Sequence, residues 1–232
     1  MTVEMTGEMT GSYNTAPHKK RRLSLFIKTI IAVLIASTSH AATYAIDGDT
    51  IELDGTRIRI NGIDAPEYGQ KCGAWDCGKS AADKMSALLR TGSLRCEIHG
   101  QDGYGRSIAT CEAGGKDIGE AMVLSGNAWA FEKYSDAYLE QQALAQKAGL
   151  GIWGAPSVPA WEYRAAAWES AKQTAPKGCP IKGNITENGH IYHAPWSPWY
   201  ARTRINEAKG ERWFCSEDEA VAAGWRAPLW SK

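Results

Sequence analysis

Three short blocks of this sequence carry side chains that could together cleave a phosphodiester bond. They supply two acids for a hard cation, one further carboxylate and two guanidinium groups. A cation and arginines would neutralise the phosphoryl charge, while the spare carboxylate would act on a water molecule. The blocks are Asp47-Gly48-Asp49-Thr50, Arg59 with Asp64-Ala65-Pro66-Glu67, and Tyr104-Gly105-Arg106.

Each block alone has a simpler interpretation than catalysis. The D-G-D sequence at residues 47–49 is typical of a turn, and residues 64–67 are typical of a polar loop. Their occurrence in one chain with Arg59 and Arg106 favours a site. Arginine suits it because its planar fork can hold a phosphate through two hydrogen bonds.

Short strands and helices around these blocks are expected to bring them together. Residues 43–63 alternate like hairpin sheet, with Asp54-Gly55 as the turn. Apolar residues at helical spacing predict helices further along, and Ser135 is the expected N-cap of the third. The expected strands are 50–53, 57–60, 94–98 and 107–111, and the expected helices are 78–89, 118–124 and 135–148. This pattern indicates a mainly β protein with helices, a five-stranded OB-type barrel with about three helices.

The first 41 residues have the character of a secretory signal peptide. A KKRR segment at 19–22 precedes an apolar run that ends at Ser39-His40-Ala41, a small-x-small cleavage pattern. A retained N-terminal anchor is the alternative. Either way, we expect the body of the protein to be exported, secreted or periplasmic. The whole chain has a formal net charge of zero. Without residues 1–41 it has 21 basic and 24 acidic side chains, a net of −3, which excludes a histone-like coating protein.

Six cysteines follow the expected cleavage point and fall into three pairs that are local in sequence. An oxidising compartment makes disulfides the expected outcome. The pairs are Cys72 with Cys77, Cys96 with Cys111, and Cys179 with Cys215. For the last pair, a Cys₂His₂ zinc site with His190 and His193 is the alternative, although export favours the disulfide.

The chain changes in composition near Pro176-Lys177-Gly178. We expect residues 42–162 to form the OB-type domain, 163–178 a linker, and 179–232 a small aromatic-rich α+β module. In that module, residues 216–223 have the pattern of a short helix. Ser216 is its expected N-cap, and Glu219 completes a capping box.

The sequences DGDT, RIRINGIDAPE and DGYGR, in this order and separation, closely resemble the thermonuclease (micrococcal-nuclease-like) family. The resemblance covers roughly residues 43–160 and continues through EAMVLSGNAW. The segment from Cys179 to Arg226 is similar to a short module found appended to such nucleases, and this second resemblance implies no chemistry.

The resemblance implies an OB-type barrel that cleaves DNA and RNA with Ca²⁺ and leaves 3′-phosphate ends. It also implies a role for each matching residue. Asp49 and Asp64 would be metal ligands through their side chains and Ala65 through its carbonyl, with Asp47 near the metal through water. Arg59 and Arg106 would hold the scissile phosphate, Glu67 would be the general base, and Tyr104 and Tyr134 would contact the nucleotide.

These observations favour an exported Ca²⁺-dependent nuclease that acts on DNA, RNA or both. We expect a monomer with no stable protein partner, and membrane contact only if the N-terminal segment is retained. The main alternative is a catalytically inactive OB-fold module that binds nucleic acid, and a cell-envelope binding protein is a third. The enzyme is favoured because the sequence has every residue that the resemblance assigns to catalysis and metal binding through side chains: Arg59, Arg106, Asp49, Asp64 and Glu67.

Overall fold

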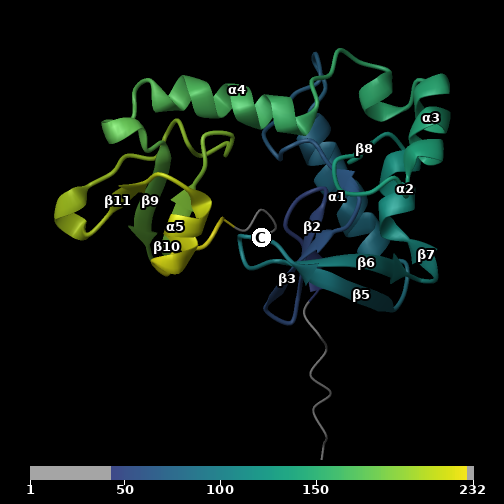
Figure 1. Ribbon diagram of the computed structural model, residues 1–232, viewed down its shortest axis with the longest axis horizontal. Helices are drawn as coiled ribbons and strands as arrows, with labels where there is room; N and C mark the ends of the chain where they lie inside the picture. Colours follow the sequence, from purple (N-terminus) through teal and green to yellow (C-terminus); the bar gives the residue numbers. More distant parts are fainter. Residues whose placement is uncertain (1–42, 229–232) are drawn as a thin grey trace, which may run out of the picture. The chain divides into compact units, whose positions relative to one another are not determined.

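The computed structural model describes residues 43–228 (Figure 1). The expected signal peptide or anchor at 1–41 lies outside the described residues. Within residues 43–228, no helix has the length and apolar character needed to cross a membrane.

The N-terminal part is built on a six-stranded sheet with the order β1-β2-β3-β6-β5, in which β7 pairs with β6. Neighbouring strands are antiparallel except β3 and β6, which are parallel. A separate two-stranded sheet pairs β4, which ends in Asp64, with β8. The bounds are β1 Thr43–Ala45, β2 Thr50–Leu53, β3 Thr56–Ile60, β4 Ile63–Asp64, β5 Leu94–Gln101, β6 Ser107–Ala113, β7 Lys116–Asp117 and β8 Trp129–Ala130.

The β2–β3 hairpin confirms the predicted turn at Asp54-Gly55. Both residues have positive φ, 51° and 80°. Two-residue hairpin turns of type I′ need positive φ at both positions, and Asp-Gly is a preferred pair for them. The turn fixes the register in which Thr50 pairs with Arg59. The block Asp47–Thr50 is therefore held directly beside Arg59.

Helices α1 (Cys77–Leu89), α2 (Ile118–Leu124) and α3 (Leu139–Lys147) lie together beside this sheet (Figure 1). Their buried side chains join those of the strands in one core that includes Ile51, Ile60 and Met85. This mainly β architecture with helices agrees with the expected OB-type barrel.

Helix α3 begins later than expected, at Leu139 and not at Ser135. The Ser135 hydroxyl accepts a hydrogen bond from the Ala137 amide at 3.2 Å and does not cap the helix. A local turn over residues 131–135 ends at this serine, since the amides of Tyr134 and Ser135 both donate to the carbonyl of Phe131. Serine competes for such turns as readily as for caps.

Helix α4 (Ala160–Lys172) occupies most of the stretch expected as a linker, and the short 3₁₀ turn η2 (Pro176–Gly178) follows it. The remaining chain forms an antiparallel sheet of order β10-β9-β11 with helix α5, which is the expected small α+β arrangement. Ser216 caps α5 by accepting from the Glu219 amide at 3.1 Å. The bounds are β9 Ile181–Thr186, β10 Gly189–His193, β11 Arg212–Phe214 and α5 Glu217–Ala222, with 3₁₀ turns η1 Gly151–Trp153 and η3 Glu207–Lys209.

All six cysteines are bridged, in the three local pairs expected from the sequence. Cys96 and Cys111 are direct partners across β5 and β6. Because Cys179 is bonded to Cys215, neither thiol is left for the alternative zinc site. The His193 ring instead lies within hydrogen-bonding distance of Ser197 and Asn184.

Candidate active site

Arg59 joins the two acids expected to hold a metal. Its Nη1 lies 2.7 Å from Asp49 Oδ2, and its Nη2 lies 2.9 Å from Asp64 Oδ1. Asp49 directly precedes β2, Arg59 lies near the end of β3, and Asp64 ends β4; the hairpin register places Arg59 opposite Thr50, the neighbour of Asp49. The Asp64 side chain is 0% exposed, so its charge requires partners within the protein.

The Asp47–Thr50 turn positions the Asp49 carboxylate. Asp47 Oδ1 accepts hydrogen bonds from the amides of Asp49 at 3.0 Å and Thr50 at 2.8 Å. Asp49 itself accepts from the Thr50 hydroxyl and from the Ala65 amide. Burial alone would raise the pKa of Asp49, but Arg59 and the Ala65 amide outweigh it and lower that pKa. Asp49 is therefore held as a carboxylate, and Asp47 stabilises the turn that carries it.

Glu67 lies on a loop that is fixed from inside by Gln70. The Glu67 amide donates to Gln70 Oε1 at 3.1 Å, and Gln70 Nε2 donates to the Val158 carbonyl at 2.6 Å. The Cys72–Cys77 disulfide closes the same loop before α1 begins. Burial raises the pKa of Glu67 to about 7, although Arg164 opposes the rise. A carboxylate with such a pKa can act as a general base near neutral pH.

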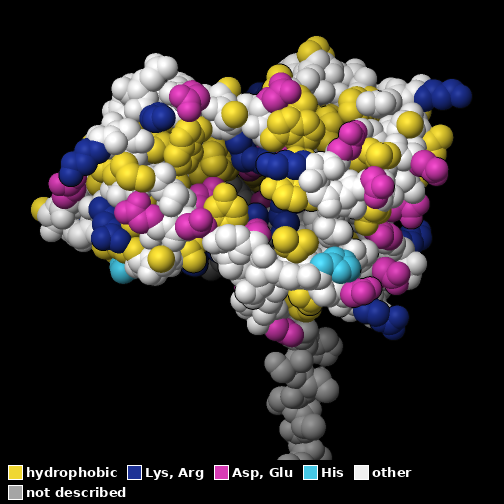
Figure 2. All heavy atoms as spheres, viewed as in Figure 1, with side chains coloured by type: hydrophobic (Ala, Val, Ile, Leu, Met, Phe, Trp, Pro, Cys, Tyr) yellow, Lys and Arg dark blue, Asp and Glu magenta, His cyan; other side chains and the backbone are white. Residues whose placement is uncertain are grey.

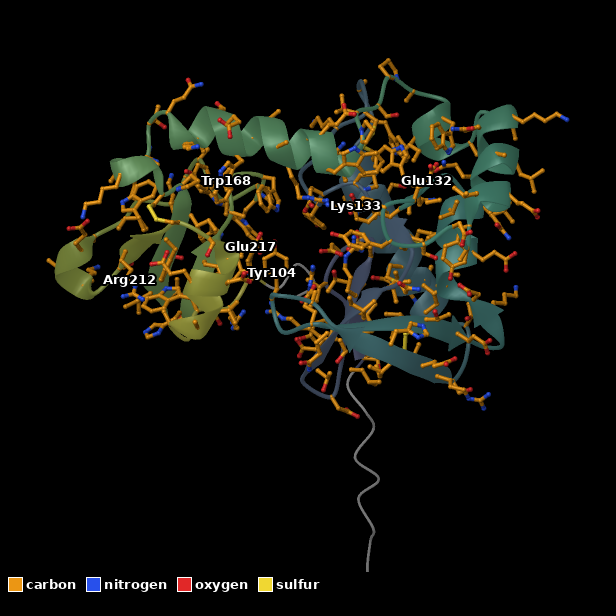
Figure 3. The ribbon with its side chains drawn as sticks, viewed as in Figure 1. Tyr104, Glu132, Lys133, Trp168, Arg212 and Glu217 are labelled. Carbon is orange, nitrogen blue, oxygen red and sulfur yellow. A yellow bond between two sulfur atoms is a disulfide. The ribbon has the colours of Figure 1, made fainter. Side chains whose placement is uncertain are left out.

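Arg106 lies at the start of β6, where the tight 102–106 turn holds it. Its Nε is 2.7 Å from Asp102 Oδ2, and its Nη1 is 3.5 Å from the Thr50 hydroxyl. The Arg106 guanidinium also lies 5.2 Å from the centre of the Tyr104 ring. Tyr104 points toward Glu217 of α5 (Figure 3). Burial and the nearby Glu217 raise the pKa of Tyr104, so its hydroxyl stays protonated.

Most of these side chains face a common cleft of about 1120 Å³. A hollow on one face of the molecule has Lys and Arg side chains at its base (Figure 2). Asp64 and Ala65 are buried and do not line the cleft. Tyr134 lines it but is 68% exposed, with its ring edge-on to Phe131 at 5.0 Å. Expected site residues on the cleft wall are Asp47, Asp49, Arg59, Glu67, Tyr104, Arg106 and Tyr134.

A third guanidinium, which the sequence did not reveal, lies among the acids. Arg164 of α4 reaches Glu67 Oε1 at 2.7 Å and Asp64 Oδ2 at 2.9 Å. It belongs to the stretch expected as a linker, and a lone arginine in an Ala-rich helix gives no local signal of a site. Its partners are about one hundred residues earlier in the chain.

The donor set suits a hard cation in chemistry, because Asp49, Asp64 and the Ala65 carbonyl all offer oxygen. Within the described part of the chain, however, no three acidic, histidine or cysteine side chains converge as a ready metal cage. Arginine nitrogens contact the carboxylate oxygens instead. The residues fit Ca²⁺ by type, and binding would require the guanidinium groups to shift.

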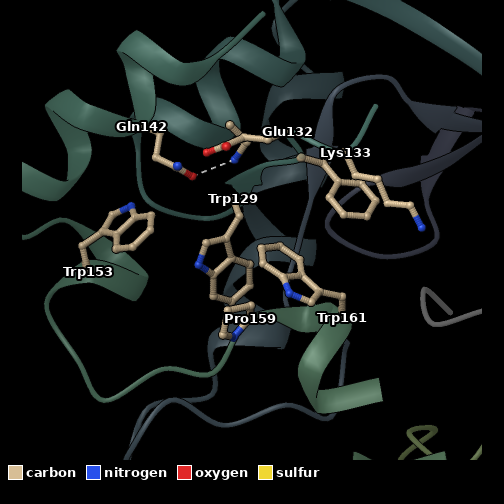
Figure 4. A pocket seen from close by; sticks show the side chains of 9 residues that line it. Trp129, Glu132, Lys133, Gln142, Trp153, Pro159 and Trp161 are labelled. Carbon is tan, nitrogen blue, oxygen red and sulfur yellow. Dashed lines mark hydrogen bonds between the residues drawn. The ribbon is translucent and has the colours of Figure 1, made fainter. Parts of the chain in front are cut away.

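A second, apolar pocket of about 560 Å³ lies beside this site. Trp129 stands between Trp153 and Trp161 in its wall, and Glu132 and Lys133 lie at its edge (Figure 4). Trp161 also stacks on Phe131, with ring centres 5.5 Å apart. Phe131 lines both the pocket and the cleft, so the aromatic cluster forms a shared wall between them.

Comparison with known proteins agrees with this arrangement. Residues 57–155 match the sequence model of the family described as staphylococcal nuclease homologue, and residues 161–227 match a second family described as ArfC. The chain is 41% identical over 160 residues to a succinoglycan biosynthesis protein ExoI of Rhizobium meliloti, covering 60% of this chain and 83% of that protein. An uncharacterized endonuclease of Escherichia coli O157:H7 is 34% identical, over 57% of this chain and 88% of its own length. A micrococcal nuclease of Shigella flexneri is 31% identical, over 52% and 77%. This chain therefore belongs to the staphylococcal nuclease homologue family.

Proposed function

We propose that this protein is an exported, Ca²⁺-dependent nuclease that hydrolyses DNA, RNA or both. Membership of the family makes it a nuclease, a hydrolase of phosphodiester bonds. The observation that carries the proposal is the single cleft that receives Asp49, Arg59, Glu67 and Arg106 from separate elements. A binding module without catalysis would not need a carboxylate with a pKa raised to about 7 in the same cleft as Arg59 and Arg106.

In the proposed reaction, Arg59 and Arg106 hold the non-bridging oxygens of the scissile phosphate. Glu67 takes a proton from a water molecule, which attacks phosphorus in line. The 5′ oxygen leaves, so the products carry 3′-phosphate ends. A bound Ca²⁺ would neutralise charge on the phosphoryl group. Asp49 and Asp64 would hold this ion together with the Ala65 carbonyl.

The proposed compartment is outside the cytoplasm, secreted or periplasmic, and a membrane anchor is the alternative. The three disulfides support it, because such bridges persist in oxidising compartments. We propose a monomer whose partner is its nucleic-acid substrate. Tyr104 and Tyr134, both on the cleft wall, would contact the nucleotide.

Digestion of plasmid DNA and of RNA, with Ca²⁺ or with EGTA, tests the proposal directly. Cleavage should require Ca²⁺, and new ends should resist ligation until a phosphatase has removed the 3′-phosphates and a kinase has phosphorylated the 5′-hydroxyls. Glu67→Gln keeps the size of the side chain and removes the base, so the rate should fall on the order of 10²–10⁴-fold. Binding of nucleic acid with no cleavage under any of these conditions would favour the inactive OB module.

A further inference from the structure

Arg164 occupies the centre of the acidic site. Its Nη1 donates to Glu67 Oε1 at 2.7 Å and to Asp64 Oδ1 at 3.2 Å, and its Nη2 donates to Asp64 Oδ2 at 2.9 Å. One planar guanidinium therefore spans the proposed base and a proposed metal ligand. Fork-shaped contacts of this kind are stronger and more directional than a lysine contact.

The start of α4 fixes the position of Arg164. Ala160 is fully buried, and Trp161 packs on Phe131 and edge-on to Trp129. Residues three apart on a helix share a face, so anchoring Trp161 directs Arg164 toward the site one turn later. Val158, two residues before α4 begins, is also tied to the Glu67 loop through Gln70. The contact is thus built into the packing and is not a chance surface pair.

Arg164 and a divalent cation need the same carboxylate oxygens. Asp64 is completely buried, and both of its oxygens face guanidinium groups, from Arg59 and Arg164. A cation that binds Asp64 must displace at least one of these contacts. The displaced guanidinium then lacks a counter-charge in a partly buried position, which is unfavourable unless another anion replaces the carboxylate.

A phosphate group is the anion that such a fork binds well. We propose that Arg164 couples cation binding to phosphate binding. In the free protein it neutralises Asp64 and Glu67 and opposes the cation. When substrate is present, it transfers to the phosphate and leaves the carboxylate oxygens open. This inference rests on the proposed nuclease function and adds a residue from outside the matched nuclease segment, residues 57–155.

Calorimetry on the full chain can measure this coupling without catalysis. Ca²⁺ is titrated into the protein alone and into the protein saturated with a nucleoside 3′,5′-bisphosphate. Arg164→Gln should bind Ca²⁺ alone about tenfold more tightly than the unchanged chain, because the competing charge is gone. Its gain in Ca²⁺ affinity from the bisphosphate should shrink by a similar factor.

Two further variants serve as a control for lost charge and as a test of the guanidinium geometry. Lys172→Gln removes one positive charge from an exposed position eight residues further along α4, roughly 12 Å away, and should leave both affinities unchanged. Arg164→Lys keeps the charge and loses the fork, so it should retain weak binding of Ca²⁺ alone but lose part of the coupling. If Arg164→Gln does not fold, the coupling measured in Arg164→Lys still tests the proposal.

Unchanged or weaker binding of Ca²⁺ by Arg164→Gln would overturn the inference, and so would equal coupling in all variants. If the unchanged chain cleaves DNA with Ca²⁺ but the variants give either of these results, only the role proposed for Arg164 fails. If the unchanged chain neither binds Ca²⁺ nor cleaves nucleic acid, the proposed function fails with it.

Discussion

One added methyl group at Gly78 should displace Glu67 and slow the reaction. Gly78 lies in the first turn of α1, where a Cβ atom would overlap the carbonyl oxygen of Glu67. The same Cβ would lie 2.6 Å from the Glu67 carbonyl carbon and 2.8 Å from that of Tyr68. These are backbone atoms, so no change of side-chain rotamer can relieve the overlap.

The loop has little freedom to absorb this overlap. The Gly78 amide donates to the Gln70 carbonyl at 3.1 Å, and the Gln70 amide donates to the Glu67 carbonyl at 2.7 Å. Restoring ordinary van der Waals separation needs a backbone shift on the order of 1 Å. A misplacement of this size costs roughly 10²-fold in rate. Overpacking of this kind lowers the free energy of unfolding by about 1–3 kcal/mol.

Gly78→Ala is best compared with Gly100→Ala, the same substitution where a Cβ meets no atom within 4 Å. Initial rates of plasmid nicking give the effect on activity, and urea unfolding gives the effect on stability. Gly100→Ala should change neither by much. A Gly78→Ala protein with a normal rate would show that the Glu67 loop is not fixed by its contact with α1.

Three other changes test separate parts of the structure. Arg59→Ala should lower the cleavage rate on the order of 10²-fold or more, because it removes a phosphate donor and leaves Asp64 short of a partner; a normal rate in a folded variant would exclude Arg59 from the reaction. Burial lowers the pKa of His193 from 6.5 to about 4, so the unfolded chain takes up this proton first on acidification. Between pH 7 and pH 4 the unchanged chain should therefore lose about 3 kcal/mol more free energy of unfolding than a His193→Gln variant, and an equal change in the two proteins would contradict this. The Cys179–Cys215 bridge closes a separation of 36 residues, so replacing both cysteines by alanine should cost about 4 kcal/mol in urea unfolding followed by tryptophan fluorescence.

The parts of the fold that depend on near neighbours could be predicted from the sequence. The Asp54-Gly55 turn and the Ser216 cap each rest on a few adjacent residues, and the structure has both. The start of α3 could not be predicted in this way, because Ser135 fits a turn as well as a cap. There the carbonyl of Phe131, bonded to the following amides, decides the outcome.

The residues of the candidate site likewise fall into those that local sequence predicts and those that it does not. The acids and the two expected arginines stand in recognisable blocks, so their types and order indicate a site before any geometry is known. Arg164 stands in no block, and its place depends on how Trp161 packs against residues thirty positions earlier. Packing between distant segments leaves no mark in the local sequence, so only the folded chain reveals this residue.

The order of the cysteines along the chain has a consequence for how the protein matures. Six cysteines can pair in fifteen ways, and here each bonds to the next one in sequence, with no bridge enclosing or crossing another. A chain that enters an oxidising space from its N-terminus presents each cysteine together with its correct partner before the next pair emerges. In the proposed exported form, this order needs only an oxidant that closes the bridges in turn, and no isomerase to rearrange wrong ones.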